Sequence, residues 1–327
     1  MTIARKRLID VAATPYYMIT ARCVRRAYLC GECHLTGKNY EHRKLWVEER
    51  LAFLSRVFAI DIAAYAVMSN HYHLVLRIDA DRASQWSDGN VIRRWKRLFR
   101  ISPIIAQSQK ETASKAIKDK AQELIEEWRN RLMDISWFMR TLNEYLARKA
   151  NGEDHCTGRF WEGRFKSTAL LDEAAVITAM AYVDLNPIRA KVAKAPESSK
   201  HTSIEQRIRK LKKQPISSNI KLMTLSSSTH QPHKNSVALS TKDYLELIDW
   251  SGRLLRKGKR GAIDNHQPPI LERLNLDAEG LMALLSRTDD IKGLTALGSS
   301  VALTYYIEFF DKFFLKGQGI NRKLYTT

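Results

Sequence analysis

The pattern of apolar and polar residues in the first eighty positions predicts β-strands. Runs rich in aromatic and β-branched residues, bounded by polar positions, lie at 15–24, 60–67 and 71–78, and such runs are typical of strands. Ser69 and Asn70 lie between the last two runs, and a short polar connection of this kind predicts a tight hairpin. The three runs therefore predict a small antiparallel sheet.

Other parts of the chain carry apolar residues at the three- and four-residue spacing of a helix. This spacing predicts helices at 41–58, 134–149 and 172–185, and a basic segment at 158–171 predicts one more strand. Residues 82–133 are mostly polar and helical in pattern, which indicates a helical insertion on the surface. Helices and strands in this order predict an α+β fold.

The composition changes after residue 195. Residues 196–240 hold one lysine-rich helical piece and are otherwise rich in Ser, Thr, His and Asn, which is typical of a linker. Residues 241–327 are helical in pattern. We therefore predict a first domain at 1–195, a linker at 196–240 and a helical C-terminal region to which the sequence assigns no role.

The charge balance indicates a polyanionic partner. The 327 residues include 54 Lys and Arg against 35 Asp and Glu, a net charge of +19, and such an excess favours binding to nucleic acid. No segment approaches the roughly 18 consecutive apolar residues of a membrane-spanning helix, and the basic N-terminus lacks the features of a signal peptide. We expect a cytoplasmic, nucleoid-associated protein with no membrane partner.

Two histidines at the start of the run 71–78 form the strongest candidate for a functional site. Side chains alternate between the two faces of a strand, so His71 and His73 point the same way and Tyr72 points the other way. Two imidazoles can hold a divalent ion and leave positions open for further ligands and for phosphate oxygens. The alternative is a pair of histidines that only make hydrogen bonds at a strand end.

Three blocks of sequence, in order, carry a resemblance to a known family. They are Met68-Ser69-Asn70-His71-Tyr72-His73, Gly158-Arg159-Phe160-Trp161-Glu162-Gly163-Arg164-Phe165-Lys166 and Ala181-Tyr182-Val183-Asp184-Leu185-Asn186-Pro187-Ile188-Arg189-Ala190. The first resembles the HUH motif of single-tyrosine transposases. Together the blocks resemble the insertion-sequence-200-like and REP-associated tyrosine transposases, over about 14 to 192.

This resemblance implies a fold and a chemistry. The fold would be a ferredoxin-like antiparallel sheet with helices on one face. His71 and His73 would hold Mg²⁺ or Mn²⁺, and a helix tyrosine would attack single-stranded or hairpin DNA to give a 5′-phosphotyrosine and a free 3′-hydroxyl. Members of the family often act as dimers, so a homodimer is an open alternative.

The nucleophile has two candidates. Tyr145 is the first, because it lies on the helix that the resemblance places beside the histidine strand, and Tyr182 is the second. A tyrosine that only fills the helical pattern is the alternative for both. The family commonly has a polar metal ligand one turn after the tyrosine, but that position is Lys149, and a protonated amine cannot bind a metal.

Two groups of basic residues are candidates for contact with DNA phosphates. Lysine and arginine contacts of this kind position a strand without specifying its sequence. A second basic stretch, at 93–100, has Trp95 and Phe99 between its charges, a mixture that suits stacking on bases. The other candidates are Arg22, Arg25 and Arg26 at the end of the first predicted strand, and Arg159, Arg164 and Lys166 of the second block.

We therefore expect a metal-dependent tyrosine transposase or nuclease that cuts and rejoins single-stranded or hairpin DNA. The first rival is a DNA- or RNA-binding regulator that descends from such an enzyme and does not cut, an interpretation that Lys149 favours. The second rival is a phosphodiesterase that uses metal-activated water.

Overall fold

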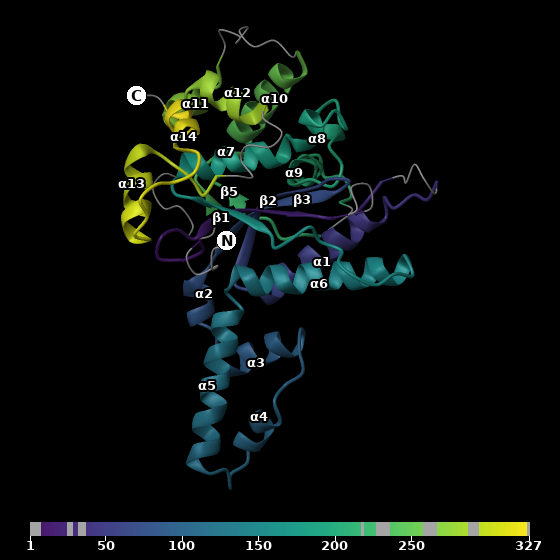
Figure 1. Ribbon diagram of the computed structural model, residues 1–327, viewed down its shortest axis with the longest axis vertical. Helices are drawn as coiled ribbons and strands as arrows, with labels where there is room; N and C mark the ends of the chain where they lie inside the picture. Colours follow the sequence, from purple (N-terminus) through teal and green to yellow (C-terminus); the bar gives the residue numbers. More distant parts are fainter. Residues whose placement is uncertain are drawn as a thin grey trace.

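A five-stranded sheet lies at the centre of the computed structural model (Figure 1). Its strand order is β2-β3-β1-β4-β7; the first four strands are antiparallel neighbours, and β7 pairs with β4 in parallel. The structure describes residues 8–24, 29–31, 37–216, 219–226, 236–257, 267–286 and 294–325. The strands are β1 (Tyr16–Arg22), β2 (Ile60–Val67), β3 (His71–Ile78), β4 (Lys166–Leu170) and β7 (Ala296–Leu297).

The strands predicted at 60–67 and 71–78 and the hairpin between them agree with the structure. β2 and β3 have the expected bounds, and the Met68 amide donates to the His71 carbonyl across the turn at a distance of 2.9 Å. β4 is shorter than predicted, because residues 158–165 form a loop that touches the sheet through one bridge between Trp161 and Cys23. The class is a mixed α+β fold.

Helices cover both faces of this sheet. Helices α1 (Arg43–Val57) and α6 (Ile135–Glu153) lie on one face, and α7 (Glu173–Asp184) lies on the other (Figure 1). The expectation of helices on one face only is therefore wrong. Leu74 and Val75 point to opposite faces of β3 and both are fully buried, so each face needs a cover.

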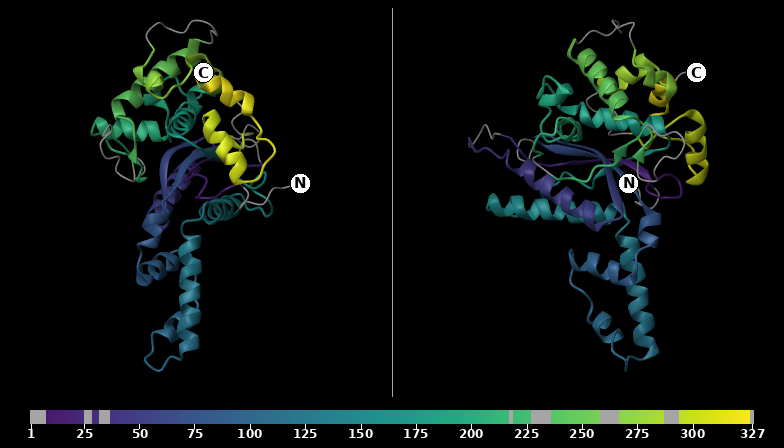
Figure 2. Two further views of the ribbon diagram at one scale, coloured as in Figure 1. Left: turned by 90° about the vertical axis from the view of Figure 1, so that its left-hand side faces the viewer. Right: turned by 180° about the vertical axis from the view of Figure 1, so that it is seen from behind.

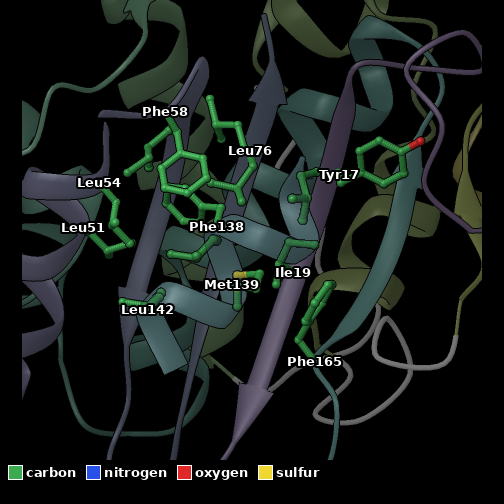
Figure 3. Close-up of a cluster of buried hydrophobic side chains, with 14 of the residues drawn as sticks. Tyr17, Ile19, Leu51, Leu54, Phe58, Leu76, Phe138, Met139, Leu142 and Phe165 are labelled. Atoms are coloured by element: carbon green, nitrogen blue, oxygen red, sulfur yellow. The ribbon is translucent and has the colours of Figure 1, made fainter. Parts of the chain in front are cut away.

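The face under α1 and α6 is an apolar core (Figure 3). Leu51 and Leu54 of α1 meet Phe138 and Leu142 of α6, and all four side chains are fully buried. Phe58 packs edge-to-face on Phe138 with ring centroids 5.4 Å apart. Burying each such side chain contributes about 1.5–3 kcal/mol, so this face provides much of the stability of the fold.

The face under α7 includes a buried polar cluster. Asp184 is fully buried, and its carboxylate accepts hydrogen bonds from Ser203 Oγ, the Ile204 amide and Tyr244 Oη at 2.5, 2.9 and 2.5 Å. Burial raises the pKa of Asp184 to about 6. These bonds join α7 to the chain around residue 203 and to the helix that carries Tyr244.

Part of the predicted linker is packed. Helix α9 (Ser203–Leu211) lies against β2, with Ser203 and Ile204 fully buried. The physical reason is the buried Asp184 carboxylate, which takes its hydrogen bonds from this segment. The shorter elements of 186–240 are α8 (Asn186–Arg189), a 3₁₀ turn (Pro196–Ser198), β5 (Thr224–Leu225) and β6 (Ser236–Val237).

The C-terminal region is mainly helical, and most of it packs on the same side of the sheet as α7 (Figures 1 and 2). Leu303 and Tyr306 of its helix at Ser300–Phe309 instead join the core on the other side. It also supplies β7, which no pattern in the sequence predicted. The division of the chain into domains stays a prediction. The helices are α10 (Thr241–Lys257), α11 (Pro269–Arg273), α12 (Ala278–Ser286), α13 (Ser300–Phe309) and α14 (Gln318–Leu324).

A helical arm leaves the body between β3 and α6 (Figure 2). Ser87 and Ser114 cap two of its helices, because each hydroxyl accepts a hydrogen bond from a first-turn amide. Arg94 fixes the arm to the end of α1 by donating to the Arg56 and Val57 carbonyls at 2.6 and 3.0 Å. The arm helices are α2 (Ala80–Ser84), α3 (Asp88–Lys96), α4 (Pro103–Ser108) and α5 (Lys115–Arg131).

Candidate nucleic-acid interface

The structure brings His71 and His73 together on one face of β3. Their ring centroids are 4.8 Å apart and the rings are nearly perpendicular, at 89°. His71 is half-buried at the start of the strand, and His73 is fully buried. The alternation of the strand therefore gives the arrangement that the sequence predicts.

Oxygen atoms orient both imidazoles through Nδ1. The His71 Nδ1 lies 2.5 Å from Asn70 Oδ1, and the His73 Nδ1 lies 2.9 Å from Thr20 Oγ1. An amide oxygen only accepts, so His71 donates from Nδ1 and carries its lone pair on Nε2. A hydrogen bond at the second ring nitrogen is the usual way in which metal-binding histidines are oriented.

Two of the predicted DNA contacts lie on the same face as the histidines. Arg22 is the register partner of His71 on β1, and Thr20 is the partner of His73. Lys166 of β4 is in turn the partner of Thr20. Residues opposite each other in an antiparallel pair share a face, so the imidazoles lie beside two cationic side chains at one end of the sheet.

Tyr182 reaches this face from α7. Its ring centroid is 5.8 Å from that of His73, at 89°, and the side chain is fully buried. The Arg189 guanidinium lies 3.8 Å from the centre of the Tyr182 ring and donates to the Leu285 carbonyl at 3.1 Å. Burial lowers the pKa of Arg189. Of the two candidate tyrosines, Tyr182 is thus the one beside the histidines.

Tyr145 lies on the other side of the sheet. The Tyr72 side chain points away from the histidines and donates from Oη to Asn143 Oδ1 at 2.5 Å, which places α6 on the Tyr72 face. The Tyr145 ring packs under the guanidinium of Arg50 of α1, 4.6 Å from its centroid. The structure does not bring Tyr145 and the histidine pair together within one chain.

Lys149 completes the surroundings of Tyr145. Its Nζ donates to Tyr145 Oη at 3.5 Å and lies 4.3 Å from the centre of the Trp46 ring. A protonated amine cannot bind a metal. This corner is a packing contact between α1 and α6.

The remaining predicted DNA contacts are divided between structural and exposed positions. Arg159 donates from Nε to the Trp161 carbonyl at 2.7 Å and also donates to the Glu162 carbonyl, so it holds its own loop. Arg164 is exposed at the end of that loop. Arg25 and Arg26 lie outside the described residues.

Sequence reasoning missed Thr20 and Arg189. Thr20 lies in the predicted first strand, and only the register between β1 and β3 shows that it contacts His73.

In the described part of the chain, no group of three or more His, Cys, Asp or Glu side chains is placed to hold a metal ion.

Comparisons with known proteins give one finding. No protein-family model and no curated protein matches the chain. A solved structure of a REP-associated tyrosine transposase bound to a REP hairpin is similar over 72% of this chain and 100% of that chain, with 13% sequence identity and a TM-score of 0.38. This likeness is too weak to establish the fold or the function of this chain.

None of the helices that the structure describes has both the length and the apolar character to cross a bilayer.

Proposed function

We propose that this protein binds single-stranded or hairpin DNA at the end of the sheet that carries the histidines. The observation that supports this proposal is the register of three strands, which gathers His71, Arg22 and Lys166 on one face. The exposed side chain of Arg164 precedes β4 at the same end. Phosphate groups would bind these cations, in a chain whose net charge is +19.

The proposal includes a divalent ion, Mg²⁺ or Mn²⁺, at His71 and His73. The donor set supports it, because the Nδ1 contacts to Asn70 and Thr20 direct the opposite ring nitrogens away from those partners. When bound, the ion would polarise a phosphodiester bound beside it. Phosphate oxygens would complete its coordination.

The core of the fold is proposed to be ferredoxin-like. Its support is the element order β1-α1-β2-β3-α6-β4 and the strand order β4-β1-β3-β2, which is the arrangement of a split βαβ fold. The helices α7 to α14 and β7 are additions to this core.

DNA strand transfer is the fuller form of this function. A tyrosine oxygen would bond to phosphorus while the bond to the 3′-oxygen breaks, which leaves a 5′-phosphotyrosine and a 3′-hydroxyl. Tyr182 supports this step within one chain, because its ring lies 5.8 Å from His73. Tyr145 could take part only from a second chain, since α6 lies on the opposite face from the histidines.

Binding without cutting is the second candidate function. Two observations favour it: Tyr145 contacts Lys149 on the far face, and Tyr182 is fully buried under Arg189. Because the Tyr182 side chain is fully buried, a bound phosphodiester could reach its oxygen only if the packing around it opened. A regulator that descends from a transposase needs only the basic face.

A covalent-capture assay separates these functions. Purified protein is mixed with labelled hairpin DNA taken from the flanks of its own gene, with Mn²⁺ or with chelator, and resolved under denaturing conditions. A metal-dependent adduct that is lost in His71→Ala and in Tyr182→Phe supports strand transfer in one chain.

Two variants mixed together test the route through a second chain. If His71→Ala and Tyr145→Phe each form no adduct but regain it when mixed, the tyrosine acts from a partner copy. Binding that survives chelation, with no adduct and no cleavage of any substrate, supports the regulator. Cleavage without an adduct in the double variant Tyr145→Phe/Tyr182→Phe supports a phosphodiesterase instead. The proposal of DNA binding is wrong if neither form of DNA binds.

A further inference from the structure

The helical arm carries a hollow that the proposed function does not use. The hollow measures about 460 Å³ and lies where α3, α5 and the start of α6 meet. This volume is within the roughly 300–1,000 Å³ of small-molecule sites. A second hollow of about 670 Å³ adjoins it along residues 96–101, and Phe99 and Arg100 line both.

Aromatic rings form the floor of the first hollow. Trp95 and Trp128 are stacked with centroids 5.3 Å apart and planes at 5°, and they are only 5% and 4% exposed. These two rings hold the arm together. Trp137 and Phe99 are only partly buried, with centroids 5.7 Å apart at 88°, so their rings have surface left for a ligand.

Arginines surround this floor. The Arg131 and Arg140 guanidinium groups lie 4.4 and 4.9 Å from the centre of the Trp137 ring, and Arg140 is 60% exposed. The carboxylate of the lining residue Glu127 accepts from Arg131 Nη2 at 2.5 Å, so its charge is balanced. The lining of the hollow is therefore cationic as well as aromatic.

The adjoining stretch supplies more positive charge. Lys96, Arg97 and Arg100 are exposed along the second hollow. Arg94 from the same stretch is not available, because it fixes the arm to α1. Of the exposed cations at 93–100, Lys96, Arg97 and Arg100 line the second hollow, and Arg93 lies outside both hollows.

We propose that this hollow binds an unpaired nucleotide of a single-stranded nucleic acid. The base stacks on the face of the Phe99 ring, with the perpendicular Trp137 ring at its edge, and the phosphates on either side contact Lys96, Arg97 and Arg100. Aromatic rings and arginine planes accept any base in this way, because every base has a π-face. The surface is thus a second nucleic-acid contact with little sequence preference.

This contact is separate from the histidine face. The inference rests on the proposed function, because both contacts need a nucleic-acid ligand. The arm begins after Ile78, at the end of β3 away from His71. Seven steps of about 3.3 Å along the strand separate those two residues by about 23 Å.

Fluorescence anisotropy with labelled oligothymidylate, and with a blunt duplex of the same length, tests the inference on the full chain. The double variant Lys96→Gln/Arg100→Gln removes two charges beside the hollow. Its matched control, Lys110→Gln/Lys118→Gln, removes two exposed charges from the arm outside it. We expect the first pair to weaken single-strand binding about tenfold more than the control pair.

A second variant reports on stacking. Phe99→Leu keeps an apolar side chain but removes the ring, and we expect it to weaken single-strand binding at least about fivefold while duplex binding changes little. The oligonucleotide should also quench tryptophan emission in the wild type more than in this variant. Far-ultraviolet circular dichroism of each variant confirms that the helices are intact.

The outcomes separate this inference from the proposed function. Equal effects of the two charge pairs, or equal losses for single strand and duplex in Phe99→Leu, would overturn the arm contact. Loss of binding in Arg22→Gln/Lys166→Gln with no loss in the arm variants would overturn it too, while supporting the histidine face. Loss in the arm variants alone supports the arm and removes the histidine face as the DNA site.

Discussion

The two faces of the central sheet are built from different kinds of residue. Under α1 and α6, the side chains of β1 and β3 are aromatic or aliphatic and pack into one core. Under α7, the same strands present His73, Thr20 and Arg22, and a buried carboxylate, Asp184, lies close by. The face under α1 and α6 thus mainly stabilises the fold. The face under α7 also carries imidazole, hydroxyl, guanidinium and carboxyl groups.

The largest effect should come from the apolar face. Phe138→Ala removes a fully buried ring that packs on Phe58, and we expect a loss of about 3–5 kcal/mol in the free energy of unfolding. Urea denaturation measures it. Arg148→Ala, at an 80% exposed position of the same helix, is the control and should change stability by less than about 0.5 kcal/mol. A loss below about 1 kcal/mol for Phe138→Ala would contradict the conclusion that the face under α1 and α6 provides much of the stability of the fold.

The polar face should instead show a dependence on pH. The pKa of Asp184 is raised to about 6 in the folded chain, from an ordinary value of 3.8. Its contribution to stability is therefore full below the unfolded pKa and is lost as the pH rises through about 6. From pH 5 to pH 7 we expect the wild type to lose about 1 kcal/mol relative to Asp184→Asn.

Denaturation of both proteins at the two pH values measures this difference. Asp184→Asn removes the titrating group and keeps one oxygen, which can accept from Ser203 Oγ and the Ile204 amide as Asp184 Oδ1 does. The new amide nitrogen then faces Tyr244 Oη, a hydroxyl that can accept as well as donate. A difference between wild type and variant that is the same at both pH values, or that grows in favour of the wild type at pH 7, would show that this carboxyl does not titrate as expected.

The smallest effect should come from the rim of the polar face. Arg22→Gln/Lys166→Gln should leave the free energy of unfolding within about 0.5 kcal/mol of the wild type, because both side chains are surface cations. Their loss should lower the slope of log affinity for single-stranded DNA against log salt by about 1.4. A salt titration by anisotropy measures the slope. An unchanged slope would place the phosphates elsewhere.

Local features of the fold could be predicted from the sequence because short-range patterns determine them. The bounds of β2 and β3 follow from apolar runs on either side of a polar turn. The pairing of His71 and His73 follows from strand alternation alone. The core stripe of α6 follows from helical spacing, and the structure buries Ile135, Met139, Leu142 and Leu146 as that spacing predicts.

The position of Tyr145 could not be predicted in the same way. Helical spacing shows which side of α6 is buried, but not which face of the sheet the helix covers. That choice depends on long-range packing, because both faces of the sheet are covered and helical spacing does not say which helix covers which face. The contact between Tyr182 and His73 was equally hidden, because it joins residues more than a hundred positions apart.

The short strand β7 has a consequence for the order in which the chain can fold. Its two residues pair with β4 along the sheet edge, although each lies 127 positions later in the chain than its partner: Ala296 pairs with Ala169, and Leu297 pairs with Leu170. During synthesis the edge of β4 stays bare until residue 297 has left the ribosome, and bare edges invite pairing with other chains. For most of its synthesis the nascent chain therefore lacks β7. The β4 edge must be shielded during that time if it is not to pair with other chains.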